Sequence, residues 1–408
     1  MSEFVDAELG RSQENETHTH VSPAGTTDDP AFASVIGALG TPGSVDLVPT
    51  PALLCDLDLL AANIEAMQRI ADAAGVALRP HAKSHKSARI ARMQLDAGAV
   101  GICVAKMSEG EALVAAVEAD GGPPLPLLVT SPLGSGAVAS RAIALAGRCD
   151  LSLVVDHVDG VIELAAAMAG GPTVTVLCDV DVGLGRTGVT GPGPALEVVA
   201  RIEDTPSLRF AGVQGYAGHA QHIVGRDFRR RSVDTATNRL TEVIGALETA
   251  GHHVALRTGG GTGTGLLDIE LGVLTELQVG SYVFMDREYR DALGADPESQ
   301  FAQSLTLATT VISSNQPGFV TVDAGLKSMA TDAGVPAVVD RPDATYAFFG
   351  DEQGLIAPSG GWSPVRGDRL RLVPPHCDPT VDRHDRIWLT RADTVVDVAA
   401  VTARGRSY

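Results

Sequence analysis

The chain has 408 residues, a formal net charge of −19 at pH 7, and 44% apolar residues. A large core is therefore possible, whereas nucleic acids and anionic membrane surfaces are poor partners because both require a basic face. No apolar run reaches the roughly 18 residues that a membrane-spanning helix needs.

The first 45 residues are predicted to be a disordered extension. This stretch is largely polar and lacks the basic and apolar regions of a secretory signal. The cysteine count is odd, and no pair has C-x-x-C spacing, which argues against a disulfide framework or a structural zinc site. We therefore expect a reducing, cytoplasmic compartment. The cysteines are Cys55, Cys103, Cys149, Cys178 and Cys377.

Between residues 46 and 295, strand and helix patterns alternate, beginning with a short strand at 53–56. The next strands are short, rich in Val and Leu, and do not alternate in polarity, which is typical of parallel strands covered on both faces. Eight such strands predict a (β/α)8 barrel. An open doubly wound sheet is the alternative, but no G-x-G-x-x-G follows the first strands. The eight runs are 76–79, 101–104, 125–130, 151–155, 174–179, 208–214, 254–257 and 276–279.

From residue 296 to 408 the pattern changes. Helical periodicity becomes scarce, Pro and Gly are frequent, and β-branched residues gather in short runs. We predict a second, mostly antiparallel β domain, with the boundary between residues 293 and 303. Its expected strands are 304–313, 318–322, 369–373 and 387–396.

A basic motif, Arg-Pro-His-Ala-Lys-Ser-His-Lys at 79–86, follows the strand 76–79. Barrels of this kind place their reacting groups at the carboxyl ends of the strands. Lys83 stands among other cations, which should lower its pKa and make its amine a nucleophile toward an aldehyde. The alternative is a solvated basic turn.

Two more motifs follow strand ends. The Gly- and Thr-rich loop 259–265 suits a phosphate because its backbone N–H groups can converge, although a flexible turn would also explain the glycines. In the segment 179–186, Arg186 could bind an anionic oxygen. It could instead be a surface residue that pairs with Asp179 or Asp181.

Histidines mark the next motif, which follows the strand 208–214. Either His219 or His222 could be a general base, because imidazole titrates near neutral pH. A capping or solvent-exposed histidine is the alternative for each of them.

The last motif, Pro-Pro-His-Cys-Asp-Pro-Thr at 374–380, lies in the second domain. An extended backbone would project His376 and Asp378 to one side and Cys377 to the other. An imidazole and a carboxylate suit Mn²⁺, Mg²⁺ or Zn²⁺. Water and substrate oxygens would complete such a catalytic site.

Together and in this order, these motifs resemble the D-threonine aldolase and D-serine dehydratase family, whose members are fold-type III pyridoxal-phosphate (PLP) enzymes related to alanine racemase. Gly-x-Gly-Arg-x-Gly at 183–188 and Val-Gly-Ser-Tyr at 279–282 add to the match. The resemblance covers residues 50–408. It implies a barrel with a second β domain, and we expect a homodimer.

The resemblance also implies site residues. Lys83 would form the Schiff base with PLP, and Arg186 would contact the phenolic oxygen of the cofactor. Gln278 would face the pyridine nitrogen, where a neutral amide should make the ring a weaker electron sink than a carboxylate would. Ala105 replaces a Gln that we expect in several relatives, which puts one cofactor contact in doubt. Further implied contacts are Tyr216, Thr262, Gly280, Ser281 and Tyr289.

For the reaction, the resemblance assigns His376 and Asp378 to a divalent metal and His222 to the substrate hydroxyl. The dehydratase branch has His-x-Cys at the metal, so His-x-Asp resembles the aldolases, which cleave D-3-hydroxy amino acids such as D-threonine, D-allo-threonine or 3-hydroxy-D-aspartate to glycine and an aldehyde. A D-3-hydroxy amino acid dehydratase is the runner-up. A racemase needs no metal, and a PLP carrier would lack the second domain.

Overall fold

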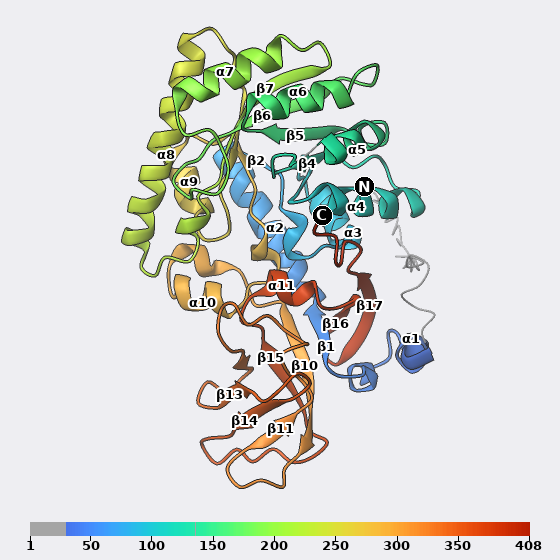
Figure 1. Ribbon diagram of the computed structural model, residues 1–408. Helices are drawn as coiled ribbons and strands as arrows, with labels where there is room; N and C mark the ends of the chain where they lie inside the picture. The colour runs from blue at the N-terminus through green and yellow to red at the C-terminus, as the bar shows by residue number, and fades with distance from the viewer. Residues whose placement is uncertain (1–29, 135) are drawn as a thin grey trace, which may run out of the picture.

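A curled sheet of parallel strands forms the upper part of the molecule in Figure 1. The computed structural model describes residues 30–134 and 136–408. Within these residues the sheet has eight strands in the order β2-β9-β8-β7-β6-β5-β4-β3, and a parallel bridge between His81 and Cys103 joins its two ends. The predicted barrel is therefore confirmed. Its strands are β2 (Ala77–Leu78), β3 (Ile102–Val104), β4 (Leu127–Val129), β5 (Leu151–Val155), β6 (Val174–Asp179), β7 (Leu208–Gly215), β8 (Leu256–Gly259) and β9 (Glu276–Leu277).

Helices cover the outer face of this sheet, and the main core lies between the two layers. All six residues of β6 are buried, which explains why its apolar residues do not alternate with polar ones. The helices of this part of the chain are α2 (Leu57–Ala74), α3 (Ala88–Asp96), α4 (Met107–Ala119), α5 (Gly136–Ala146), α6 (Val158–Ala167), α7 (Pro192–Glu203), α8 (Arg226–Thr249), α9 (Gly265–Leu271) and α10 (Arg287–Leu293).

A second, mostly antiparallel sheet lies below the barrel in Figure 1, as predicted. Among the described residues it has nine strands, in the order β13-β14-β11-β10-β1-β16-β17, with β15 pairing with β10 and β12. The strands are β1 (Ala52–Asp56), β10 (Leu305–Ser313), β11 (Val320–Val322), β12 (Ala337–Val338), β13 (Thr345–Phe348), β14 (Gly354–Ala357), β15 (Arg369–Val373), β16 (Arg386–Arg391) and β17 (Thr394–Ala400).

Two details of this sheet differ from the sequence-based expectations. The strand β1 lies within the span predicted as barrel, yet it pairs antiparallel with β10 and parallel with β16. The run 387–396, expected to be one strand, is a hairpin, because Arg391 pairs with Thr394 and Ala392 adopts φ 51° in the turn between them.

The expectation of a disordered extension is wrong for residues 30–45, and positions 1–29 lie outside the described residues. The short helices η1 (Pro30–Phe32) and α1 (Ala33–Gly37) pack on the second sheet, where Val35 is fully buried. The ring of Phe32 lies 5.5 Å from that of Trp388. Burial against strands near the end of the chain therefore orders this segment.

All five cysteines are free and buried, as the absence of paired spacings predicted. Within residues 30–134 and 136–408, no helix is long and apolar enough to cross a membrane.

Candidate active site

The carboxyl ends of the barrel strands enclose a cavity of ≈ 560 Å³, and a segment of the second domain also lines it. All eleven residues predicted for the site lie in this one cavity. They come from the loops after β2, β6, β7, β8 and β9, from α10, and from the start of α11 (Cys377–Val381). The eleven are Lys83, Arg186, Tyr216, His222, Thr262, Gln278, Gly280, Ser281, Tyr289, His376 and Asp378.

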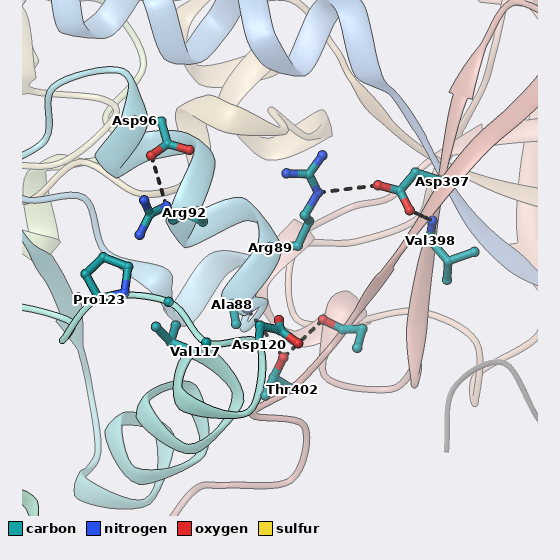
Figure 2. Close-up of a pocket in the computed structure, with 13 residues that line it drawn as sticks. Ala88, Arg89, Arg92, Asp96, Val117, Asp120, Pro123, Asp397, Val398 and Thr402 are labelled. Atoms are coloured by element: carbon teal, nitrogen blue, oxygen red, sulfur yellow. Dashed lines mark hydrogen bonds and ion pairs between the residues drawn. The ribbon is translucent and has the colours of Figure 1, made fainter. Parts of the chain in front are cut away.

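Another cavity, of ≈ 420 Å³, lies between α3, the end of α4 and β17 (Figure 2). Four of its five charged side chains form ion pairs, because Arg89 Nε lies 3.3 Å from Asp397 Oδ2 and Arg92 Nε lies 2.9 Å from Asp96 Oδ1. None of the eleven predicted residues lines it. We therefore assign the candidate active site to the cavity at the barrel mouth.

Lys83 lies in the short helix η3 (Ala82–Ser84), directly after β2. His81 Nδ1 accepts the backbone N–H of Lys83 at 3.3 Å and so fixes the start of this turn. The ammonium group of Lys83 lies 3.7 Å from Asp378 Oδ2 and 5.7 Å from the centre of the Tyr216 ring. The barrel lysine and the carboxylate of the second domain thus meet in the cavity.

The expectation that neighbouring cations lower the pKa of Lys83 is wrong. Burial lowers it, but Tyr216 and Asp378 raise it, so that the pKa lies above its ordinary value. Burial also lowers the pKa of His81, and it lowers that of His85 to about 4. Both imidazoles are therefore neutral at pH 7 and do not repel the ammonium group.

Lys86, the other lysine of the motif, is a structural residue. Its backbone is left-handed, with φ 49°. Its side chain is only 8% exposed, and its Nζ lies 2.7 Å from Asp382 and 3.3 Å from Glu109. Because a buried charge needs such partners, Lys86 is committed to these carboxylates. Lys83 is the lysine of the motif that faces the cavity.

Arg186 makes no ion pair with another described residue, so the alternative pairing with Asp179 or Asp181 is wrong. Asp181 instead accepts two backbone N–H groups of its own loop, each at 2.9 Å. The guanidinium of Arg186 lies 5.7 Å from the centre of the Tyr216 ring, which also lies beside Lys83. Two cations at one aromatic ring fit a cofactor with anionic phenolic and phosphate oxygens.

The glycine-rich loop after β8 is held in place rather than free. Gln221 reaches it from the preceding loop, and its Oε1 accepts the N–H of Gly263 at 3.0 Å. A Cβ at Gly263 would clash with the backbone oxygen of Gln221, so glycine is required for this close approach. Gly261 and Thr262 therefore present the loop to the cavity, where they could cradle a phosphate.

Of the two candidate histidines, His222 lines the cavity and the exposed His219 does not. The His222 ring packs on Tyr289 with centroids 4.4 Å apart, and its Nδ1 lies 3.5 Å from Glu288 Oε1. Its Nε2 is buried and has no hydrogen-bond partner among the described residues. Burial, assisted by His376, lowers the pKa of His222 to about 4, so the neutral ring can accept a proton.

The expectation of an extended backbone at the metal motif is wrong beyond His376. His376 is the extended N-cap of α11, and Cys377–Val381 are helical. His376 and Asp378 nevertheless both line the cavity, while Cys377 is fully buried. Asp378 Oδ1 also accepts a hydrogen bond from Ser281 Oγ at 3.1 Å, which joins the motif to the barrel.

The donor chemistry of this pair fits a divalent cation. His376 Nδ1 lies 2.7 Å from Asp332 Oδ2, an arrangement that is typical of metal-binding histidines and leaves Nε2 free. Burial raises the pKa of Asp378, but Lys83 and His376 lower it below its ordinary value. In the described residues no cluster of three or more His, Cys, Asp or Glu side chains could hold a metal, so water would supply other ligands.

Asp286 fixes the metal motif against α10. It is fully buried, and its two carboxylate oxygens accept the backbone N–H groups of Tyr289 at 2.9 Å and Cys377 at 2.8 Å. Burial raises its pKa to about 6. One carboxylate thus sets the position of Tyr289 relative to His376 and Asp378.

Sequence reasoning missed several residues of this site. Thr130 and Lys106 line the cavity directly after β4 and β3, and an inspection of every strand end would have found them. Asp332 and Glu288 contact the two histidines from segments that carry no motif. Ala105, where we expected Gln in relatives, also lines the cavity.

A parallel barrel with a lysine after β2 and a second, antiparallel sheet defines the alanine racemase-like class of enzymes. Residues 55–288 match the family model described as alanine racemase, N-terminal domain, and residues 304–390 match a serine dehydratase domain. The chain therefore belongs to the alanine racemase N-terminal domain family, as the motifs predicted.

Its relatives identify the branch of this family. The chain is 39% identical to a D-threonine aldolase from Arthrobacter sp., over 88% of this chain and 94% of that protein. It is 36% identical to a 3-hydroxy-D-aspartate aldolase from Paracoccus denitrificans (strain Pd 1222), over 88% and 93%. The crystal structure of D-threonine aldolase from Filomicrobium marinum matches with a TM-score of 0.84 and 35% identity, over 89% and 98%.

A D-threo-3-hydroxyaspartate dehydratase from Delftia sp. (strain HT23) is less similar, with 31% identity over 76% of this chain and 79% of that protein. The chain is thus a member of the fold-type III PLP-dependent lyases and is more similar to the aldolases than to this dehydratase.

Proposed function

We propose that this chain is a PLP- and divalent-metal-dependent lyase that cleaves D-3-hydroxy amino acids, such as D-threonine or 3-hydroxy-D-aspartate, to glycine and an aldehyde. The 3.7 Å distance between Lys83 Nζ and Asp378 Oδ2 is the observation that supports this most directly. It brings the amine that would hold PLP and a carboxylate that would hold a metal to the same substrate.

Lys83 would hold PLP covalently, and Arg186 would face its anionic phenolic oxygen. Thr262, Gly280 and Ser281 would surround the phosphate, and Tyr216 would contact the ring. Bound PLP would draw electron density from the glycine carbon when the Cα–Cβ bond breaks.

His222 would take the proton of the β-hydroxyl group. Its buried Nε2 lacks a partner among the described residues, and Glu288 beside Nδ1 would favour the imidazolium that forms. Tyr289, whose ring packs against the imidazole at an interplanar angle of 59°, would keep the ring in place. A divalent metal on His376 and Asp378, such as Mn²⁺, Mg²⁺ or Zn²⁺, would polarise the same hydroxyl group.

Product analysis tests this function. The purified chain, loaded with PLP and Mn²⁺, should convert D-threonine to equal amounts of glycine and acetaldehyde, measured by amino-acid chromatography and aldehyde-dependent oxidation of NADH. EDTA should stop the reaction, and renewed Mn²⁺ should restore it. Formation of 2-oxobutanoate and ammonia without glycine would instead establish the dehydratase.

The metal motif predicts a separate binding result. His376→Ala or Asp378→Ala should weaken Mn²⁺ binding at least about tenfold, because each variant removes one of only two protein donors. Equilibrium dialysis with Mn²⁺ measures this without any substrate. PLP absorbance should stay unchanged, which provides an internal control for folding. Unaltered Mn²⁺ affinity in both variants would show that these two residues do not hold the metal.

We also propose that the enzyme is a cytoplasmic homodimer. The five free, buried cysteines support a reducing compartment. Val224 and Phe228, which are 70% and 64% exposed beside the His222 loop, support a partner surface there. Sedimentation equilibrium of the wild-type chain and of Phe228→Glu would test the dimer, since the charged variant should dissociate.

A further inference from the structure

Two glutamines at the floor of the cavity have fixed amide orientations. Gln214 Nε2 lies 2.9 Å from the backbone oxygen of Thr130 and 2.8 Å from Asp179 Oδ1. A backbone carbonyl can only accept, so the group facing it must be the NH₂ of Gln214. The remaining oxygen, Gln214 Oε1, therefore accepts a hydrogen bond from Gln278 Nε2 at 3.1 Å.

The second proton of the Gln278 amide is also committed. Gln278 Nε2 lies 3.0 Å from Thr258 Oγ1. The Thr258 hydroxyl donates to Glu276 Oε1 at 2.9 Å, so it accepts from Gln278. The other oxygen of Glu276 accepts from Arg79 Nε at 3.0 Å, which keeps this carboxylate an acceptor. Both N–H groups of Gln278 are thus used within the protein.

Only the carbonyl oxygen of Gln278 remains for a ligand. Turning the amide over would place this oxygen against Gln214 Oε1, and two acceptors in contact repel each other. Gln278 lines the cavity and is 5% exposed, so a bound ligand would separate it from water. A ligand that offered another acceptor here would leave a buried amide oxygen unsatisfied.

PLP has few groups that can donate to this oxygen. Its phosphate and phenolic oxygens are anionic acceptors, which the cations Lys83 and Arg186 attract elsewhere in the cavity. Its ring nitrogen donates only when protonated. The carboxylate of Asp179 stands behind Gln214, and its negative charge favours a cation at the floor, whereas the charge of Glu276 behind Thr258 is compensated by Arg79.

We propose that Gln278 accepts a hydrogen bond from the ring nitrogen of bound PLP and thereby holds that nitrogen in its protonated form. This inference rests on the proposed use of PLP and goes beyond it. Gln214 and Thr258 are positioning residues, because they take both amide protons of Gln278. The expectation of a weak electron sink treated Gln278 as an isolated amide, whereas the network makes it an acceptor that matches a pyridinium.

The test is the ¹⁵N NMR shift of ring-labelled PLP in the holoenzyme, which separates pyridinium from neutral pyridine without any turnover. The wild-type chain and Gln278→Glu should both show the pyridinium signal. Gln278→Leu, which removes the acceptor, should show the neutral signal. Gln214→Leu frees one Gln278 proton and should move the signal toward neutral pyridine, whereas the exposed Gln300→Leu should leave it unchanged.

A neutral signal from PLP in the wild-type holoenzyme overturns this inference alone and leaves the proposed lyase function standing. An unchanged pyridinium signal in Gln278→Leu overturns it as well, because another group would then hold the proton. A chain that takes up no PLP, seen by absorbance before the NMR measurement, would refute the proposed function itself together with this inference.

Discussion

Lys83→Ala should abolish covalent attachment of PLP and lower the cleavage rate by roughly 10⁴-fold or more, because this amine would both hold the cofactor and orient it. Lys83 reaches the cavity and lies 3.7 Å from Asp378, whereas Lys86 is bound to Asp382 and Glu109. Borohydride reduction of the wild-type holoenzyme followed by peptide mapping should place the phosphopyridoxyl label on Lys83.

Lys86→Met provides the contrast, because it should keep the label while losing stability. A phosphopyridoxyl label on Lys86 in the wild-type chain would contradict the assignment. The raised pKa of Lys83 adds a pH dependence to cofactor uptake. Only the neutral amine attacks the aldehyde, so the rate of PLP uptake by the cofactor-free chain should rise ~tenfold per pH unit up to that pKa.

The barrel could be predicted because its pattern is local. Each strand is a short apolar run followed by a helix, and the buried strand β6 shows why such runs do not alternate. The place of β1 could not be predicted, because its partners β10 and β16 come some 250 and more residues later. Val35 likewise packs in part with Ala308, Trp388 and Val395, which come some 250 and more residues later, so a segment without a long pattern was predicted to be disordered.

The site could be predicted at the level of which residues gather, but not how they interact. Parallel strands bring their carboxyl ends to one edge, which explains why motifs from five loops share a cavity. The charge environment of Lys83 depends instead on tertiary contacts. In sequence it stands among cations, but in the fold Asp378 approaches it and burial neutralises His81. The balance of charges around Lys83 is therefore evident only from the folded structure.

The residues that hydrogen-bond to the site residues from outside could not be predicted from the sequence either. Asp332 lies 44 residues before His376, and Gln214 lies 64 residues before Gln278, yet each pair is hydrogen-bonded. A carboxylate or amide in an ordinary loop carries no signal of its own. Such residues determine which ring nitrogen or amide atom faces the ligand. They therefore determine which chemistry the residues of the recognisable motifs can perform.

The base that takes the hydroxyl proton separates an aldolase from a dehydratase. A retro-aldol cleavage must deprotonate the β-hydroxyl, which requires a base beside that oxygen. A dehydration must first remove the α-proton, for which Lys83 could serve. His222 suits the first task, because its neutral ring packs against Tyr289 and its buried Nε2 has no partner in the part of the chain that the structure describes. The pKa of about 4 implies that this base remains available well below neutral pH.

His222→Ala should therefore slow the cleavage of D-threonine by about 10²–10⁴-fold, the usual effect of removing a general base. PLP absorbance and Mn²⁺ binding should persist, since Lys83 and the metal motif are intact. His219→Ala, three residues earlier and exposed, is the matched control and should retain full activity. Equal rates for His222→Ala and the wild-type chain would show that another base, such as metal-bound water, takes the hydroxyl proton. A switch of product to 2-oxobutanoate would show that His222 selects which bond breaks.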